Sequence, residues 1–122
     1  MKIEQLIYEI QKRPGMFVKE ERLDYIFYLL SGYCGANHAL PETEDTVERN
    51  FSVWFNEWLL MWIENNIDKE YTPKTLYWYD NIKEIVQSGE NEFDVFFELC
   101  KSFFEDYKDK KGYFSDKEYT LE

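Results

Sequence analysis

The fold is decided by the stretch Val47–Ile63, which reads VERNFSVWFNEWLLMWI. Its apolar residues recur at intervals of three and four, as on one side of an α-helix of about four turns. The recurring residues are Val47, Phe51, Trp54, Phe55, Trp58, Leu59, Trp62 and Ile63. Leu60 and Met61 lie off this face, so we expect a central helix that is buried on more than one side.

Helical periodicity extends to the N-terminal side of this stretch. Residues 2–12 carry a short apolar stripe that ends before Pro14-Gly15, because proline restricts the preceding residue and glycine favours a turn. A second helix is expected from about Glu20 to Cys34. Gly32 and Gly35 either weaken the end of this helix or allow close packing against it.

Two further helices are expected in the second half of the chain. Thr72-Pro73 is typical of an N-cap followed by proline at the first helical position, and this helix would stop at Gly89. Asn91 is suited to cap a last helix whose apolar residues repeat at helical spacing. These residues are Phe93, Phe96, Phe97, Cys100, Phe103, Phe104 and Tyr107.

These patterns predict an all-α, single-domain bundle of about five helices. A length of 122 residues suits one domain, and Phe, Tyr and Trp make up 20% of them, so the core should be rich in aromatic side chains. We expect Met16 and Phe17 to plug this core. The helical domain should span residues 1–112, followed by a polar tail over 113–122 that could dock back.

Charge is distributed unevenly along the chain. The net charge is −11, yet residues 1–41 hold five acids and five bases and are neutral. Residues 42–122 carry the whole negative charge, with twenty acids and nine bases. Such a surface repels phosphate backbones and anionic lipids, so neither nucleic acid nor a membrane is expected as partner. A basic protein is the natural complement, although solubility alone also explains the charge.

No pattern in the sequence predicts a catalytic, cofactor or metal site. His38 is the only histidine, and Cys34 and Cys100 lack the spacing of metal ligands or of a disulfide framework. No glycine spacing predicts a phosphate-binding loop. Consecutive acids such as Glu44-Asp45 usually indicate a solvated helix face. We therefore expect a binding protein without cofactor or metal, located in the cytoplasm with reduced thiols.

Several short motifs occur along the first half of the chain. They are Arg13-Pro14-Gly15-Met16-Phe17, Ser31-Gly32-Tyr33 and Phe55-Asn56-Glu57-Trp58-Leu59. Over about residues 3–63, their order resembles small bacterial immunity proteins of polymorphic toxin and contact-dependent inhibition systems. The resemblance implies a protein that binds and neutralises a cognate toxin, and it carries over no role for any single residue.

A basic, nuclease-type toxin is a physically reasonable partner. Nucleases grip phosphate backbones, so an acidic face with aromatic anchors would steer and hold one in a stoichiometric complex. We expect the contact surface within residues 42–122, at the start and polar face of the central helix and on the last helix. The candidates are Glu42, Glu44, Asp45, Glu48, Glu57 and Glu64, with Asp94, Glu98, Glu105 and Asp106.

Two alternatives stay open. An acidic DNA mimic, or a regulatory interaction protein of a mobile element, should carry regularly spaced acids, whereas aromatic stripes interrupt the acids here. An enzyme would need a pocket with two carboxylates in unequal environments. The oligomeric state is open as well, because Tyr25, Tyr28 and Tyr79 suit either a partner protein or a second copy of the chain.

Overall fold

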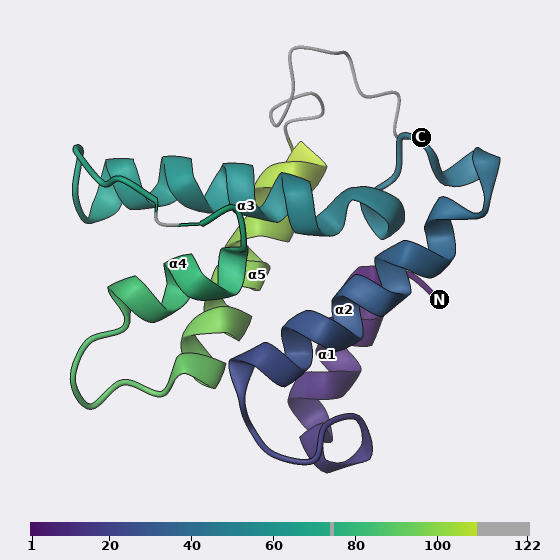
Figure 1. Cartoon of the computed structure of the whole chain (residues 1–122), viewed down its shortest axis with the longest axis horizontal. Helices are drawn as coiled ribbons and strands as arrows, with labels where there is room; N and C mark the ends of the chain where they lie inside the picture. The colour runs from purple at the N-terminus through teal and green to yellow at the C-terminus, as the bar shows by residue number, and fades with distance from the viewer. Residues whose placement is uncertain (74, 110–122) are drawn as a thin grey trace.

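The computed structural model describes residues 1–73 and 75–109 (Figure 1). Its α-helices are α1 (Ile3–Lys12), α2 (Leu23–His38), α3 (Val47–Asn66), α4 (Trp78–Ile85) and α5 (Glu92–Asp109), and two short 3-10 helices, η1 (Pro14–Met16) and η2 (Pro41–Thr43), lie in the connections. No described residue belongs to a strand. The expected all-α bundle of five helices is confirmed, and the tail expected over 113–122 lies outside the described residues.

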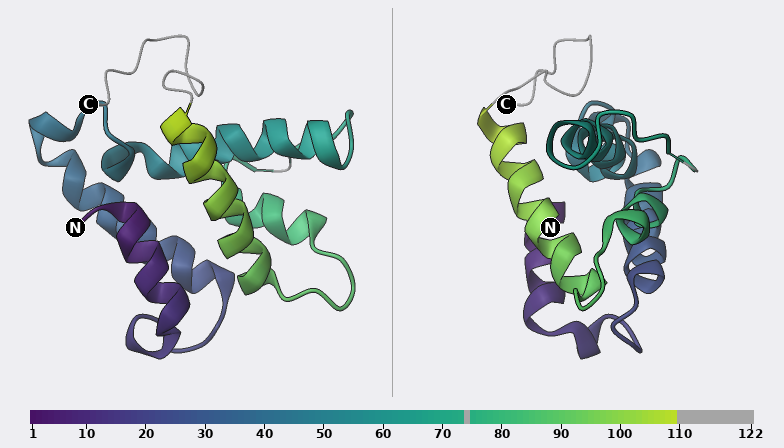
Figure 2. Two further views of the ribbon diagram at one scale, coloured as in Figure 1. Left: turned by 180° about the vertical axis from the view of Figure 1, so that it is seen from behind. Right: turned by 90° about the vertical axis from the view of Figure 1, so that its left-hand side faces the viewer.

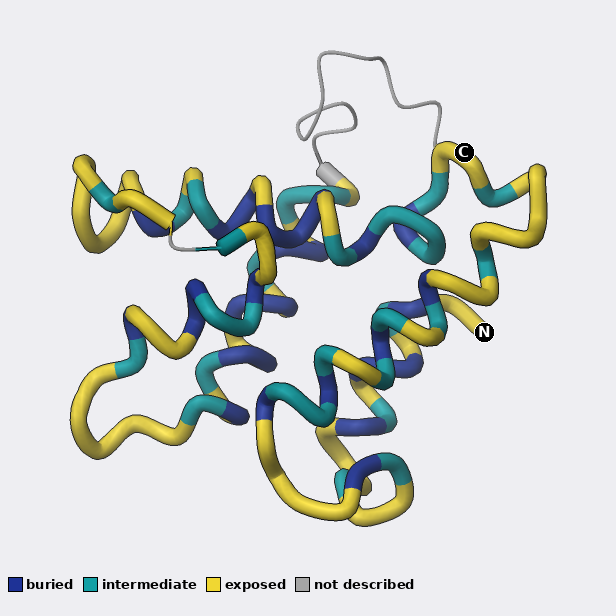
Figure 3. The backbone as a smooth tube through the Cα atoms, viewed as in Figure 1, coloured by how far each residue is buried: buried dark blue, intermediate teal, exposed yellow. Residues whose placement is uncertain are grey.

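Helix α3 is the central helix, and it contacts all four other α-helices. Figure 2 shows α3 end-on in its right-hand view, lying across two layers formed by α1 with α5 and by α2 with α4. Buried and exposed positions alternate along α3 (Figure 3). Met61 is 42% exposed and Leu60 is half-buried, so the expected burial on a second side is wrong. The neighbouring helices cover α3 on one side, and these two residues lie away from them.

The core is aromatic and is centred on Phe55. The centroid of its ring lies 5.4 Å from that of Phe103 and 5.5 Å from that of Trp78, both in edge-to-face geometry. The Phe96 ring lies 5.9 Å away in the same geometry. All four side chains are fully buried. Edge-to-face pairs at such distances add about 0.5–1.5 kcal/mol each beyond the burial of apolar area.

Local signals in the sequence set two helix ends as expected. Asn91 Oδ1 accepts the N–H of Phe93 at 2.8 Å and that of Asp94 at 3.3 Å, so Asn91 caps α5. Helix α1 ends at Lys12, just before Pro14 opens η1. The Asn91 cap therefore fixes the start of α5 and Pro14 the end of α1, as the sequence predicts.

Helix α4 starts later and is shorter than the sequence predicts. It begins at Trp78, and Thr72-Pro73 precedes it in the connection from α3. The Thr75 hydroxyl accepts the N–H of Tyr77 at 3.1 Å and donates to Asp80 at 3.0 Å. This threonine therefore organises the start of the helix, and the capping role expected of Thr72 is wrong.

Helix α2 lies further along the chain than expected, and its glycines do not serve close packing. A Cβ added at Gly32 or Gly35 would meet no atom within 4 Å. The expected core plug is also only half correct. Phe17 packs against the core, but Met16 is 72% exposed because η1 turns it to solvent.

Candidate functional site

Eight of the ten candidate carboxylates are exposed. They fall into three groups on separate elements: Glu42, Glu44 and Asp45 in η2 and the turn after it, Glu57 and Glu64 on α3, and Asp94, Glu98 and Glu105 on α5. No salt bridge between described residues involves any of the ten candidates. Their negative charge is therefore not offset by paired cations within the described chain.

The other two candidates, Glu48 and Asp106, are half-buried and join helices together. Glu48 Oε2 accepts the backbone N–H of Ile3 at 3.1 Å, which ties the start of α1 to α3. Asp106 Oδ2 accepts the indole N–H of Trp58 at 2.8 Å, which ties α5 to α3. Both carboxylates already have structural partners, so they are less available to another protein than the exposed eight.

One face of α3 combines candidate carboxylates with apolar side chains. Val53, Glu57, Met61 and Glu64 follow one another at intervals of four, four and three residues, so they lie on the same side of the helix. Val53 is 59% exposed and Met61 is 42% exposed. We call these four residues the α3 stripe. No lysine or arginine occurs within residues 50–68, so the stripe is purely acidic and apolar.

The carboxylate of Glu57 is the electrostatically distinctive group of the stripe. Partial desolvation raises its pKa above the usual value for glutamate. Desolvation penalises the charged form, whereas a cation nearby favours it. Glu57 therefore presents a charge whose free energy would improve on contact with a cation from another molecule.

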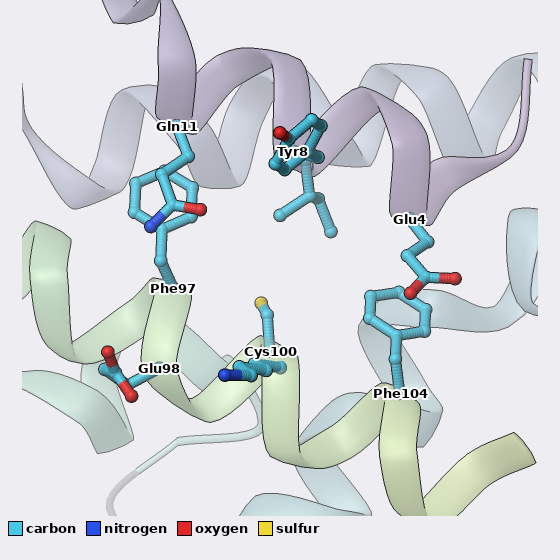
Figure 4. A pocket seen from close by; sticks show the side chains of 9 residues that line it. Glu4, Tyr8, Gln11, Phe97, Glu98, Cys100 and Phe104 are labelled. Atoms are coloured by element: carbon cyan, nitrogen blue, oxygen red, sulfur yellow. The ribbon is translucent and has the colours of Figure 1, made fainter.

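A groove of about 430 Å³ lies between α1 and α5 (Figure 4). The side chains that line it are Glu4, Ile7, Tyr8, Gln11, Phe97, Glu98, Cys100, Lys101 and Phe104. The Cys100 sulfur points into the space between the two helices. Burial raises the pKa of the Cys100 thiol well above its usual value, so the thiol stays protonated and is a poor nucleophile. The lining is mixed, because Phe97, Cys100 and Phe104 are buried whereas the polar side chains of Gln11, Glu98 and Lys101 are exposed.

Two features around α3 were not predicted from the sequence. The first is a buried polar network, in which Asn81 Nδ2 donates to Asn56 Oδ1 at 3.0 Å and Tyr71 donates to Asn81 Oδ1 at 2.8 Å. Apolar periodicity gives no signal for such a pair. The second is the apolar half of the α3 stripe, whose signal was present: Val53 and Met61 share the helical spacing of Glu57 and Glu64.

The described residues contain no helix with the length and apolar character needed to cross a membrane, and no group of three His, Cys, Asp or Glu side chains placed to hold a metal ion. Comparisons with protein-family models, with curated proteins and with solved structures each returned no match. Function is therefore inferred from the surface of the molecule itself.

Proposed function

We propose that the protein is an immunity protein that binds a cognate toxin and neutralises it in a one-to-one complex, without catalysis. The toxin would be a basic protein of the nuclease type. The observation that carries this proposal is the α3 stripe, with its two exposed carboxylates, two exposed apolar side chains and absence of cations over residues 50–68. The resemblance over residues 3–63 supports the same class of protein.

The physical properties of the α3 stripe suit the surface of a basic partner. Lysine or arginine side chains of the partner would pair with Glu57 and Glu64, and the partly desolvated Glu57 would gain most. Val53 and Met61 would exclude water around these pairs, which strengthens them, and methionine adapts to an irregular surface. The net charge of −11 adds a longer-range field that speeds the encounter with a basic protein.

The partner is identified by capturing the tagged protein from the cells that encode it, at low and at moderate salt, followed by mass spectrometry. We expect one basic protein in a one-to-one ratio, held less strongly as salt rises. Expressing that protein alone should arrest growth, and co-expression with its partner should restore it. Recovery of a restriction or transcription complex instead would favour a DNA mimic and count against an immunity protein.

The role of the α3 stripe is tested with the double variant Glu57→Lys/Glu64→Lys. The matched control is Glu98→Lys/Glu105→Lys, which changes the net charge equally but on α5. We expect the stripe variant to weaken the purified complex about 30-fold or more, mainly through faster dissociation, and the control to weaken it only a few-fold. Both variants should keep the wild-type melting temperature because all four side chains are exposed. Equal losses would assign the binding to overall charge and reject the stripe.

A further inference from the structure

A second exposed surface is made by mainly aromatic side chains of α2, of the segment that leads into α4 and of α4 itself. The Phe27 ring centroid lies 4.5 Å from that of Tyr79, 5.3 Å from that of Tyr77 and 5.6 Å from that of Tyr28. Tyr28 is 63% exposed, Tyr77 is 53% exposed, and Leu76 beside it is 86% exposed. We call these five residues the α2–α4 patch. Contiguous exposed rings of this kind typically mark an interaction surface, where tyrosine is enriched.

Buried side chains on the core side of the α2–α4 patch hold it in place. Trp78 is fully buried, and its ring lies 5.4 Å from Phe27 and 4.8 Å from Phe96 of α5, so it connects the patch to the core. Asn81 Nδ2 lies 3.3 Å from the Tyr77 carbonyl and 3.0 Å from Asn56 Oδ1 of α3, contacts that hold α4 in place. Rings that are already ordered lose little entropy when a partner binds.

This part of the surface already holds cations against tyrosine rings. The Arg22 guanidinium lies 4.7 Å from the centroid of the Tyr25 ring. The Lys83 ammonium lies 5.9 Å from the centroid of the Tyr79 ring. Both contacts lie within the usual range for attraction between a cation and the face of an aromatic ring. The chain therefore uses its own cations to cover part of the aromatic surface.

The most exposed rings of the patch, those of Tyr28 and Tyr77, have no such cation among the described residues. Negative charge lies close by. Desolvation, then the charge of Asp80, then the neighbouring Tyr28, and last the charge of Asp24 raise the pKa of Tyr79. Asp24 forms a salt bridge with Arg22 at 2.8 Å, which compensates its charge. No salt bridge among the described residues involves Asp80, so its charge is the one left to attract a cation. The Tyr77 ring stacks on the Tyr79 ring with their centroids 6.2 Å apart, yet both Tyr28 and Tyr77 stay more than half exposed. Their exposed surface, next to the ring of Tyr79 that senses the charge of Asp80, is complementary to a cation from outside the chain.

We infer that the α2–α4 patch anchors an arginine-bearing segment of a basic protein, with guanidinium groups stacked on Tyr28 and Tyr77. Arginine suits the rings better than lysine, because its planar, weakly hydrated head stacks on aromatic faces whereas an ammonium ion holds its water. A second copy of the chain is disfavoured because two molecules of charge −11 repel each other. The inference rests on the proposed function for the basic character of the partner, but it assigns a surface separate from the α3 stripe.

The probe for this site is a hexa-arginine peptide with blocked ends, compared with hexa-lysine of equal charge at moderate salt. Binding is followed through the amide chemical shifts of the isotopically labelled protein. We expect hexa-arginine to shift the resonances of the five patch residues more than hexa-lysine does. The variant Tyr28→Ala/Tyr77→Ala should weaken hexa-arginine binding about fivefold to tenfold, through loss of two exposed cation–ring contacts, and hexa-lysine binding about twofold or less.

The matched control is Tyr8→Ala, which removes a 55% exposed tyrosine of α1, outside the patch. It should bind both peptides as the wild type does, and the melting temperatures of all variants should agree. The inference is overturned if the patch variant keeps wild-type affinity, or if the two peptides shift the patch equally. It is also overturned if sedimentation shows a dimer that the patch variant abolishes, because the occupant is then a second copy.

These outcomes separate the α2–α4 patch from the proposed function. If hexa-arginine perturbs only the resonances of the α3 stripe, the patch is rejected as a binding site, and the immunity proposal is unaffected. Conversely, arginine-selective binding at the patch, with a captured partner that is basic but not toxic, would support the site and reject the immunity proposal.

Discussion

The molecule places aromatic side chains in two regions with opposite exposure. Around Phe55, the rings of α3, α4 and α5 are phenylalanine and tryptophan, and they are fully buried. In the α2–α4 patch, tyrosines predominate, and Tyr28 and Tyr77 are more than half exposed. The large apolar surfaces of phenylalanine and tryptophan rings are driven from water, whereas a phenol can meet water at its hydroxyl and a partner at its face. The buried aromatic side chains around Phe55 therefore stabilise the fold, whereas the exposed tyrosines of the α2–α4 patch are suited to recognition.

The largest expected contrast is between Phe55→Ala and Tyr77→Ala. Phe55 is fully buried among other rings, so its truncation should cost about 3–5 kcal/mol of unfolding free energy, enough to unfold much of the population. Tyr77 is 53% exposed, so its truncation should change the unfolding free energy by about 0.5 kcal/mol or less. Urea denaturation followed by circular dichroism measures both. Similar losses in the two variants would mean that the patch belongs to the core.

A smaller effect is expected where the two regions join, at the pair Asn56 and Asn81. Asn81→Leu leaves the buried Asn56 amide without its partner, which should cost about 1–3 kcal/mol. Because α4 carries both Trp78 of the core and Tyr79 of the patch, the loss should disturb both regions together.

The double variant Asn56→Leu/Asn81→Leu provides the control for this prediction. Replacing both amides with apolar groups of similar size removes the unpaired buried group, so the double variant should be more stable than Asn81→Leu alone. Additive losses in a double-mutant cycle from urea denaturation would show that the two amides do not depend on each other.

The smallest effect is expected on α2, which carries Phe27 and Tyr28 of the patch. Gly32 is exposed within this helix and has open space around it, so Gly32→Ala should stabilise the protein by about 0.5–1 kcal/mol without touching the core. Gly89→Ala is the contrasting variant, because the φ of Gly89 is +91°, and it should destabilise. Thermal melts of the two variants should therefore shift in opposite directions. A loss of stability in Gly32→Ala would contradict the open surroundings of this glycine.

The helices that could be predicted from the sequence are those with a broad apolar face. The spacing of Phe51, Phe55 and Trp58 located α3, and the side chain of Asn91 fixed the start of α5. Helix α4 was placed less well because its start depends on a hydrogen bond from Thr75 to Asp80. A short local contact of this kind competes with the Thr72-Pro73 signal, and only the folded geometry decides between them.

The sequence predicted which carboxylates belong to the candidate site, but not which of them stay exposed and which bind to other helices. Sequence reasoning selected Glu57 and Glu64 as polar-face carboxylates, and the structure places both on an exposed side of α3. It could not tell them from Asp106, whose partner Trp58 is 48 residues away along the chain. The patch was predictable only in part: the sequence analysis named Tyr28 and Tyr79 as suited to a partner, but Phe27 and Tyr77 become neighbours only when α2 and α4 pack together.

The intrinsic fluorescence of the four tryptophans reports on the folding of the protein. Trp54, Trp58 and Trp78 are buried, whereas Trp62 is only partly covered. Indole emission moves to longer wavelengths in water, so the emission maximum of the folded chain should lie at a short wavelength and shift to a longer one as the protein unfolds. A collisional quencher should reach Trp62 first and the other three only after unfolding. Intact and opened molecules can therefore be distinguished in solution without attaching any dye.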